Sequence, residues 1–204
     1  MARTRITEIG EESRQRILDA AEELFLERGY EKTTLSAIGE RCGISYGSIP
    51  WHFGNKAGLL YALVVRTFND PEQGFGLDLQ LSLTPGLTGL EQLLAHQSQW
   101  DNHPKLPLLH MLDDAFREAP QEMIDELLAV DTEWRERLKV WVSATLDGRN
   151  PPGGVTTEGI VHFIISANRG IALARRLDPS TFDHLSARAV YRQSLVAMLL
   201  LDCA

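Results

Sequence analysis

Apolar residues recur along most of the chain at steps of three and four, which is the spacing of one face of an α-helix. Between Ser13 and Arg28 this apolar face consists of Ile17, Ala20, Ala21, Leu24 and Phe25. Gly29 follows at a position typical of a helix C-terminus. The N-terminal part therefore predicts helices at 13–28, 34–42, 46–52 and 56–69, with Thr34 and Ser45 as N-caps and Gly43 ending the second.

The same periodicity returns after Leu87. It predicts helices, with prolines marking their boundaries, at 87–101, 104–118, 121–146, 156–177 and 181–202. Between the two regions lies a stretch rich in glycine and proline, in which leucines alternate at 77, 79, 81 and 83. Alternation is typical of a short strand, but an extended loop is the preferred interpretation. The predicted fold class is all-α, with about nine helices in total.

The composition is that of a globular protein, with 44% hydrophobic and 24% charged residues among 204. No apolar run approaches the ~18–20 residues of a membrane helix, and the N-terminus lacks the apolar stretch of a secretory signal. The cysteines, Cys42 and Cys203, show neither metal nor redox spacing. We therefore expect a cytoplasmic protein with no membrane span and no cofactor.

The formal net charge of −8 is unevenly distributed. Residues 1–60 hold 8 Lys and Arg against 9 Asp and Glu, whereas the rest of the chain holds 12 against 19. Phosphate binding needs only a local basic face, so the overall charge does not exclude nucleic acid. The acidic surplus of the C-terminal part favours a cationic or neutral ligand over an anionic one.

Residues 34–52 combine a short helix, a tight turn with Gly43 and a second short helix, the pattern of a helix-turn-helix. In that motif the first helix crosses the phosphates, and the second enters the major groove with its early residues facing base edges. Helix N-termini also attract phosphate. The candidate DNA-contacting residues are therefore Thr34, Ser45, Tyr46, Gly47, Ser48, Trp51, His52 and Lys56. On spacing alone, a plain helical hairpin is the alternative.

Residues 14–60 resemble the DNA-binding domain of the TetR family of bacterial repressors. The resemblance rests on Arg-Gln-Arg-Ile-Leu-Asp-Ala-Ala-Glu-Glu-Leu-Phe, Gly-Tyr-Glu-Lys-Thr-Thr-Leu and Gly-Ile-Ser-Tyr-Gly-Ser-Ile-Pro-Trp-His-Phe-Gly-Asn-Lys, in that order. It implies a homodimer with an N-terminal three-helix DNA-binding domain, residues 1–55, and a larger helical ligand-binding and dimerisation domain, residues 56–204.

The resemblance also implies roles for single residues. The family's base-reading positions fall on Ser45, Tyr46, Gly47 and Ser48, and its phosphate contacts on Thr34, His52 and Lys56. The family usually has an aromatic residue, most often Tyr, where this chain has Pro50. Since proline strains a continuing helix, we expect the recognition helix to end or kink there, with Trp51 replacing the missing contact. Arg3 and Arg5 precede the first predicted helix, as a basic arm or, preferably, a solvated terminus.

The C-terminal part predicts a helical bundle with a mostly apolar ligand cavity. Its candidate lining residues, each of which has ordinary core packing as the alternative, are Trp100, Met111, Phe116, Met123, Trp134, Trp141, His162 and Phe163. Glu158 and His162 stand at i and i+4, close enough to pair. His96, His103 and His110 are spaced by seven, but Pro104 interrupts the register, so we expect no metal site.

The last two predicted helices, 156–177 and 181–202, are more apolar than surface helices need to be. Ser166, Gly170 and Ala174 form a stripe of small residues on the first, which permits close approach of another helix. We expect these two helices to form the interface of a two-fold symmetric homodimer, although central helices of a monomer are the alternative. The recognition helices then meet successive major grooves, roughly 34–36 Å apart, on a palindromic operator.

The predicted function is a ligand-responsive, sequence-specific DNA-binding transcriptional regulator, a repressor that a small molecule releases from its operator. The alternative is a helical small-molecule-binding protein with a degenerate helix-turn-helix, which the proline at position 50 keeps open. An enzyme is not expected, because the chain has no phosphate loop, no nucleophile elbow and no cysteine with an evident histidine partner.

Overall fold

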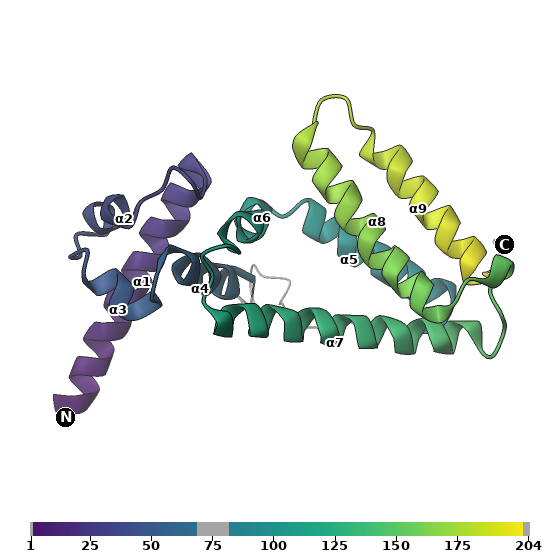
Figure 1. Ribbon diagram of the computed structural model, residues 1–204, viewed down its shortest axis with the longest axis horizontal. Helices are drawn as coiled ribbons and strands as arrows, with labels where there is room; N and C mark the ends of the chain where they lie inside the picture. The colour runs from purple at the N-terminus through teal and green to yellow at the C-terminus, as the bar shows by residue number, and fades with distance from the viewer. Residues whose placement is uncertain (1, 69–81, 202–204) are drawn as a thin grey trace. The chain divides into compact units, whose positions relative to one another are not determined.

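The computed structural model describes the backbone of residues 2–68 and 82–201 and the side chains of residues 10–67 and 82–201. Within these ranges the chain is all-helical, with nine α-helices and one short 3-10 turn, and no strand (Figure 1). The helices are α1 (Ala2–Arg28), α2 (Leu35–Cys42), α3 (Ser48–Phe53), α4 (Lys56–Phe68), α5 (Leu87–Asp101), α6 (Leu106–Ala115), α7 (Gln121–Leu146), α8 (Thr157–Leu177) and α9 (His184–Met198). None of the described helices is long and apolar enough to cross a membrane.

The chain divides into two compact units. Unit 1 comprises residues 1–78 and 103–129, and unit 2 comprises residues 79–102 and 130–204. Helix α7 thus contributes its residues up to Ala129 to unit 1 and the remainder to unit 2. The predicted functional boundary after residue 55 stays a prediction; the packing units group α4, α6 and the start of α7 with the helix-turn-helix.

Unit 1 is built around the apolar face of α1. Ile17, Leu24 and Phe25 are almost completely buried, as their helical spacing predicts. Gly29 ends the helix with a φ of +79°, a conformation that a Cβ disfavours. The apolar side chains that complete the core of this unit include Ile38, Ile49, Phe53, Leu59, Leu60, Leu63, Leu108 and Leu112.

Helix α1 is longer than its apolar pattern predicts. It begins at Ala2 and not at Ser13, so the backbone of Arg3 and Arg5 is helical. The predicted start at Ser13 was therefore wrong. The apolar period begins only at Ile17, where the helix meets the core, so the pattern gives no signal for the residues before it.

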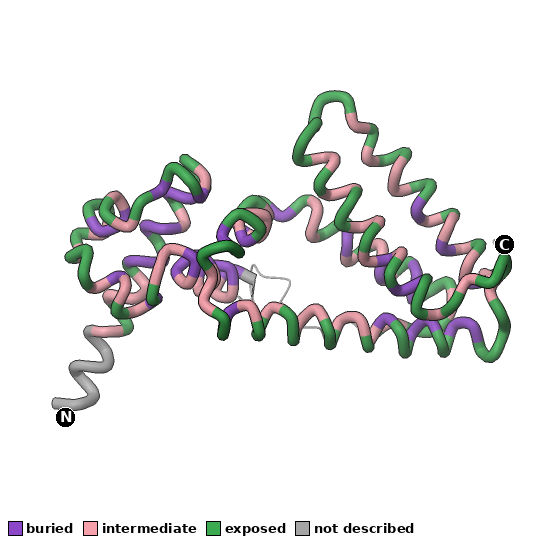
Figure 2. Tube along the Cα trace, viewed as in Figure 1, coloured by how far each residue is buried: buried purple, intermediate pink, exposed green. Residues whose placement is uncertain are grey.

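Unit 2 is a bundle of α5, the second part of α7, α8 and α9. Its core is one cluster of buried apolar residues, drawn in purple in Figure 2. The cluster consists of Leu90, Leu93, Leu138, Trp141, Val142, Leu146, Ile160, Val161, Ile164, Tyr191, Leu195 and Leu199. Gly89 of α5 leaves no room for a side chain, since a Cβ there would lie 1.8 Å from the Thr84 carbonyl oxygen and 2.4 Å from Nε1 of Trp141 on α7.

The predicted bounds of these helices agree with the structure for α5 and α7 and exceed it elsewhere. The sixth helix covers Leu106–Ala115 and not 104–118, and the ninth covers His184–Met198 and not 181–202. Asp183 begins α9 because its carboxylate accepts the Ser186 N–H across 3.0 Å. Of the alternating leucines at 77–83, those at 77–81 lie outside the described residues, so the strand question does too.

Candidate nucleic-acid interface

Helix α2 begins and ends as its sequence predicts. The Thr34 hydroxyl accepts the N–H of Ala37 across 3.2 Å, and Gly43 ends the helix with a φ of +66°. The turn that follows is tight, because a Cβ on Gly39 would lie 2.9 Å from the Ile44 carbonyl oxygen. The Arg16 guanidinium of α1 donates to the Cys42 carbonyl, so α1 holds the end of α2. The first helix and the turn of the motif are therefore fixed to the domain.

The recognition helix is shorter than predicted. Helix α3 begins at Ser48, and its N-cap position is Gly47, which makes no side-chain capping bond. Ser45 precedes the helix in a turn, where its carbonyl accepts the Ser48 N–H at 3.0 Å and its hydroxyl lies 2.9 Å from the Ser48 hydroxyl. The predicted start at Tyr46 with Ser45 as cap was wrong, because this turn replaces the first helical turn.

Pro50 neither ends nor kinks α3, so that expectation was wrong as well. Because the helix starts at Ser48, Pro50 is its third residue and lies in the first turn. N–H groups in a first turn have no intrahelical partner, so a proline there forfeits no helical hydrogen bond. The Pro50 carbonyl accepts the N–H of Gly54 at 2.8 Å, and the helix continues to Phe53.

One face of α3 is anchored and the other is open. Ile49 and Phe53 are buried, at 0% and 8% exposed, which fixes the helix on the domain. Tyr46, just before the helix, and Trp51 within it are 59% and 79% exposed. The His52 ring contacts that of Trp51 edge to face, with centroids 4.6 Å apart. Two large aromatic side chains are thus held in solvent on a rigid scaffold, which is unusual for residues of this size.

Lys56, the first residue of α4, is held at the base of the motif. Its ammonium donates to the Tyr30 carbonyl at 3.1 Å and lies 4.0 Å from the centroid of the Tyr30 ring. Asn55 caps the same helix, since its side-chain oxygen accepts the N–H of Gly58 at 2.9 Å. The Asn55 amide also donates to the Glu118 carbonyl at 2.8 Å. The segment that links α3 to α4 is therefore held by Tyr30 through Lys56 and by Glu118 through Asn55.

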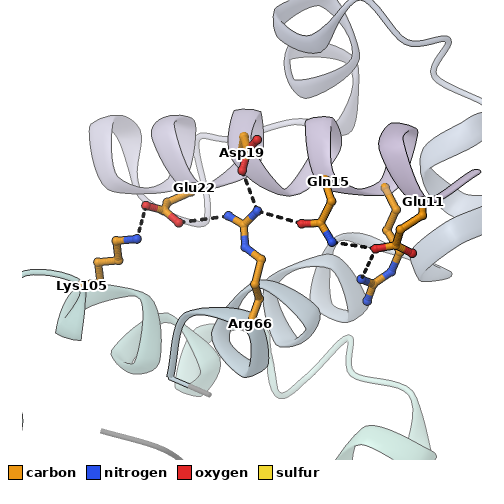
Figure 3. A network of polar contacts seen from close by, with 7 residues as sticks. Glu11, Gln15, Asp19, Glu22, Arg66 and Lys105 are labelled. Carbon is orange, nitrogen blue, oxygen red and sulfur yellow. Dashed lines mark hydrogen bonds and ion pairs between the residues drawn. The ribbon is translucent and has the colours of Figure 1, made fainter. Parts of the chain in front are cut away.

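A polar network holds the far end of α4 against α1 (Figure 3). Arg66 of α4 binds Asp19 at 2.6 Å and Glu22 at 3.1 Å. The Lys105 ammonium, just before α6, binds the other oxygen of Glu22 at 2.7 Å. Single exposed ion pairs contribute little, but here one half-buried arginine joins several acceptors. These contacts orient α4 and α6 on α1.

Sequence reasoning did not single out the contacts made by Tyr30, Glu118 and Arg66. The Tyr30 hydroxyl donates to Glu118 at 3.2 Å, and burial followed by the Glu118 charge raises the tyrosine pKa. Partners so far apart in sequence leave no periodic signal. Asn55 directly before Lys56 is a signal that was available, because asparagine is a preferred N-cap.

In unit 2 the candidate ligand residues lie in different surroundings. The Trp100 indole donates to the His96 ring at 3.0 Å, and the ring of His96 lies 6.3 Å from that of Trp134. Trp141 is 3% exposed and donates to the Thr84 carbonyl at 3.0 Å, so it packs as a core residue. Phe163 is half-buried beside the core. The part of each in ligand binding stays a prediction.

The remaining candidates are distributed over both units. In unit 1, Met111 is half-buried and Met123 is buried, whereas Phe116 is 41% exposed. In unit 2, His162 is exposed and its Nε2 lies 3.7 Å from a Glu158 carboxylate oxygen, which is near but beyond hydrogen-bond distance. Among the described side chains, no group of three His, Cys, Asp or Glu residues has the arrangement of a metal site.

The geometry of unit 1 defines a class of protein: a three-helix domain that presents a helix-turn-helix. The family described as "Bacterial regulatory proteins, tetR family" matches residues 17–63. The transcriptional regulator TtgR of Pseudomonas putida is 47% identical over 60 residues, which is 29% of each chain. SrpR of P. putida is 39% identical over 79 residues, 39% of this chain and 37% of SrpR. The chain thus spans less than half the length of these relatives.

A similarity over nearly the whole chain comes from a solved structure. NalD of Pseudomonas aeruginosa, described as the secondary repressor of the MexAB-OprM multidrug efflux pump, is 25% identical with a TM-score of 0.67. The match covers 91% of this chain and 95% of NalD. The sequence resemblance to the TetR family is therefore confirmed over residues 17–63, and the similarity in fold to NalD extends over most of the chain.

Proposed function

We propose that the protein is a ligand-responsive, sequence-specific DNA-binding regulator that acts as a repressor. The observation that carries the proposal is the helix-turn-helix of unit 1, with α3 anchored through Ile49 and Phe53 and Tyr46 and Trp51 held in solvent. An anchored helix with exposed hydrogen-bonding aromatic side chains fits the major groove of DNA. The family match over the same residues supports this reading.

The DNA contacts divide into two classes. The residues of the turn and the first turn of α3 are assigned to base edges: Ser45, Tyr46, Gly47 and Ser48. The residues at helix starts and in the C-terminal half of α3 are assigned to phosphates: Thr34, Trp51, His52 and Lys56. Thr34 and Lys56 suit this role because they stand at the N-termini of α2 and α4, where the helix dipole favours an anion.

A homodimer formed through α8 and α9 supplies the two recognition helices that a two-fold operator requires. Four large apolar residues on these helices, Leu173, Leu177, Leu185 and Val190, are between 46% and 73% exposed. Ser166 and Gly170 of the small-residue stripe are exposed beside them on α8, and a Cβ on Gly170 would meet nothing within 4 Å. Exposed apolar surface of this kind marks an interaction site. A second copy of the same helices is the occupant that a two-fold operator requires.

The effector is a small molecule bound among the helices after α4, and its binding weakens DNA affinity. The candidate residues are Trp100, Met111, Phe116, Trp134, Trp141, His162 and Phe163. The mechanism requires that the effector bind one conformer better than the other, since only differential affinity shifts an equilibrium. The description of NalD as a repressor supports release from the operator as the direction of the response.

The alternative, a ligand-binding protein that has lost DNA binding, depended on Pro50. With Pro50 in the first turn, α3 keeps its helical geometry to Phe53, so the proline gives no reason to expect lost function.

Fluorescence anisotropy with labelled DNA from upstream of the protein's own gene tests the proposal, at two salt concentrations and with unrelated DNA as competitor. We expect tight binding that unrelated DNA does not displace and that weakens as salt increases. If genome-wide fragment selection also returns no sequence that binds better than unrelated DNA, the proposed function is wrong.

A further inference from the structure

The hairpin of α8 and α9 is held in different ways along its length. The N-terminal part of α8 and the C-terminal part of α9 are buried in the core of unit 2, through Ile160, Val161, Ile164, Tyr191 and Leu195. We call residues 165–190 the distal half of the hairpin. No residue of the distal half is buried, and Figure 2 shows this part of both helices in pink and green. Its contacts with the apolar core are made by half-buried residues, Ile165, Ala167 and Ile171.

The most exposed apolar side chains of the hairpin lie in this distal half. Leu177 is 73% exposed, Leu185 70%, Val190 63% and Leu173 46%. These residues form the surface to which the proposed function assigns the second copy. The part of the hairpin that the dimer would use is thus the part in which no residue is buried.

A polar network adds to these partial core contacts. Arg188 of α9 donates to Asp101 of α5 at 2.5 Å and to Asn168 of α8 at 2.7 Å. It also donates to Gln97 of α5 at 3.2 Å, and Gln97 in turn donates to the Tyr191 hydroxyl at 3.2 Å. One guanidinium therefore joins all three helices.

The C-terminal end of α5 is the fixed point of this network. Asp101 is the last residue of α5, and its carbonyl has no intrahelical partner. Arg175 of α8 donates to that carbonyl at 3.1 Å, while Arg188 of α9 binds the carboxylate. Cations at a helix C-terminus are also favoured by the helix dipole. Each helix of the distal half is thus attached to the same residue by an arginine.

Because the network is largely buried, it tolerates little displacement of its partners. The side chains of Arg188 and Asp101 are only 17% and 14% exposed. Removing one partner of a buried pair leaves an uncompensated charge, which is strongly unfavourable, whereas apolar surfaces tolerate sliding. Buried polar groups of this kind fix the register between helices in several systems.

We propose that Arg188 is a positioning residue for dimerisation: through Asp101, Asn168 and Gln97 it sets the orientation of the distal half of the hairpin, and so the geometry of the dimer. The proposal rests on the proposed function, which supplies the second copy as partner. Because two recognition helices must fit successive major grooves, a fixed dimer geometry is what the operator spacing demands.

Arg192 offers a matched control on the same helix. It joins α9 to α5 as Arg188 does, through Glu91 at 2.6 Å, but both side chains are far more exposed, at 39% and 50%. Exposed pairs of this kind contribute little. Arg188→Met and Arg192→Met therefore remove the same charge from the same pair of helices, and only the first removes the buried network.

The dissociation constant of the dimer, from sedimentation velocity on the full chain, is the first measurement. We expect Arg188→Met to raise it at least about tenfold and Arg192→Met to change it less than about twofold. The second measurement is the distance between spin labels at Ser143→Cys of the two subunits, with both native cysteines changed to serine. Arg188→Met should broaden or shift this distance distribution, and Arg192→Met should not.

Asp101→Asn is the milder variant if Arg188→Met fails to keep its helix content. It leaves Arg188 its amide acceptors, so unit 2 should stay folded, and a weaker dimer with an altered distance distribution is expected. Equal effects of Arg188→Met and Arg192→Met, or an unchanged dimer in Asp101→Asn, overturn the inference. A monomeric wild-type protein defeats the dimer of the proposed function itself, which is a separate outcome.

Discussion

The hydroxyl of Tyr30 donates to the carboxylate of Glu118 across 3.2 Å, although 88 residues separate the two in sequence. Tyr30 follows α1, and Glu118 lies between α6 and α7, both within unit 1. The carbonyl groups of the same two residues accept Lys56 and Asn55, at the start of α4. The segment after α6 is therefore built into unit 1, together with the helix-turn-helix.

Tyr30→Phe should lower the free energy of unfolding by about 1 kcal/mol at neutral pH, the net worth of a hydrogen bond. It should also change the response to alkali. Burial, and then the Glu118 charge, raise the Tyr30 pKa, so the folded chain keeps a proton that the unfolded chain loses near pH ~10. Stability is thus lost as pH rises above that value, and less steeply in the variant.

Denaturant unfolding at several pH values between neutral and alkaline measures both effects. Tyr61→Phe is a second test in the same unit, because Tyr61 of α4 donates to Glu126 at 2.5 Å and its pKa is raised to about 12 by burial and that bond. Its stability should likewise fall less steeply in alkali than that of the wild type. Parallel pH curves for wild type and Tyr30→Phe would contradict the prediction.

His96 should make the stability of unit 2 depend on pH in the acidic range. Burial lowers its pKa, and its ring accepts the Trp100 indole N–H at 3.0 Å, which requires the neutral form. The unfolded chain binds a proton near pH ~6.5 and the folded chain only at lower pH. The stabilisation that neutral His96 contributes is therefore complete above pH ~6.5. It is lost as the pH falls from there towards the lowered pKa of His96 in the folded chain.

His96→Gln should flatten the fall in unfolding free energy between pH ~7 and pH ~5 relative to wild type. His162→Gln is the control, since His162 is exposed on α8 and pairs with Glu158 at its own surface. The comparison uses urea denaturation at matched ionic strength. A His96→Gln curve that parallels the wild-type curve would rule out this assignment.

The helices could be predicted from the sequence because their signals are local. Thr34 and Gly43 mark the ends of α2, and the apolar period together with the flanking prolines places α5 and α7 with the correct bounds. The start of α3 could not be found in this way. Whether Ser45 caps a helix or forms a turn depends on Ile49 and Phe53 reaching the core, which is a tertiary constraint.

In the candidate site, too, local features could be predicted from the sequence and long-range contacts could not. The helix-turn-helix was predicted from a run of residues in order, and a family match over residues 17–63 agrees with that prediction. The partners of Arg66 and Arg188 could not be predicted, because each arginine meets acceptors from other helices 20 to 91 residues away. Charged residues on helices carry no sign of which neighbour the fold will bring to them.

Lys56→Ala and Tyr46→Ala should affect DNA binding in different ways. Because Lys56 is assigned to a phosphate, Lys56→Ala should weaken binding to all sequences alike and lower the salt slope by about one unit. Because Tyr46 is assigned to a base edge, Tyr46→Ala should relax the base preference at particular operator positions and leave the salt slope unchanged. Because the Lys56 ammonium also binds the Tyr30 carbonyl, the helix content of the variant must be checked first.

Anisotropy titrations at several salt concentrations, with operator and mismatched fragments, separate the two roles. Lys139→Ala provides the charge control, since Lys139 lies in unit 2 and pairs with Glu158 at 3.6 Å. If the two variants at 46 and 56 lose affinity and specificity in the same pattern, the division into base and phosphate contacts is wrong.

Pro50→Tyr should strengthen DNA binding. The family resemblance implies an aromatic residue, most often tyrosine, at this position, and its hydroxyl is absent here. Position 50 lies in the first turn of α3, so the helix should accept either residue. One added hydrogen bond to a phosphate, worth roughly 0.5–1.5 kcal/mol, corresponds to an affinity gain of about twofold to tenfold.

Pro50→Phe is the matched control, because it adds the ring without the hydroxyl. Both variants should lose about 0.4–1 kcal/mol of folding stability through the freer unfolded chain, and to the same extent. Anisotropy with the selected operator then compares the three proteins at one salt concentration. Tighter binding by the tyrosine variant alone assigns the gain to the hydroxyl, whereas equal binding by both variants shows that position 50 does not reach a phosphate.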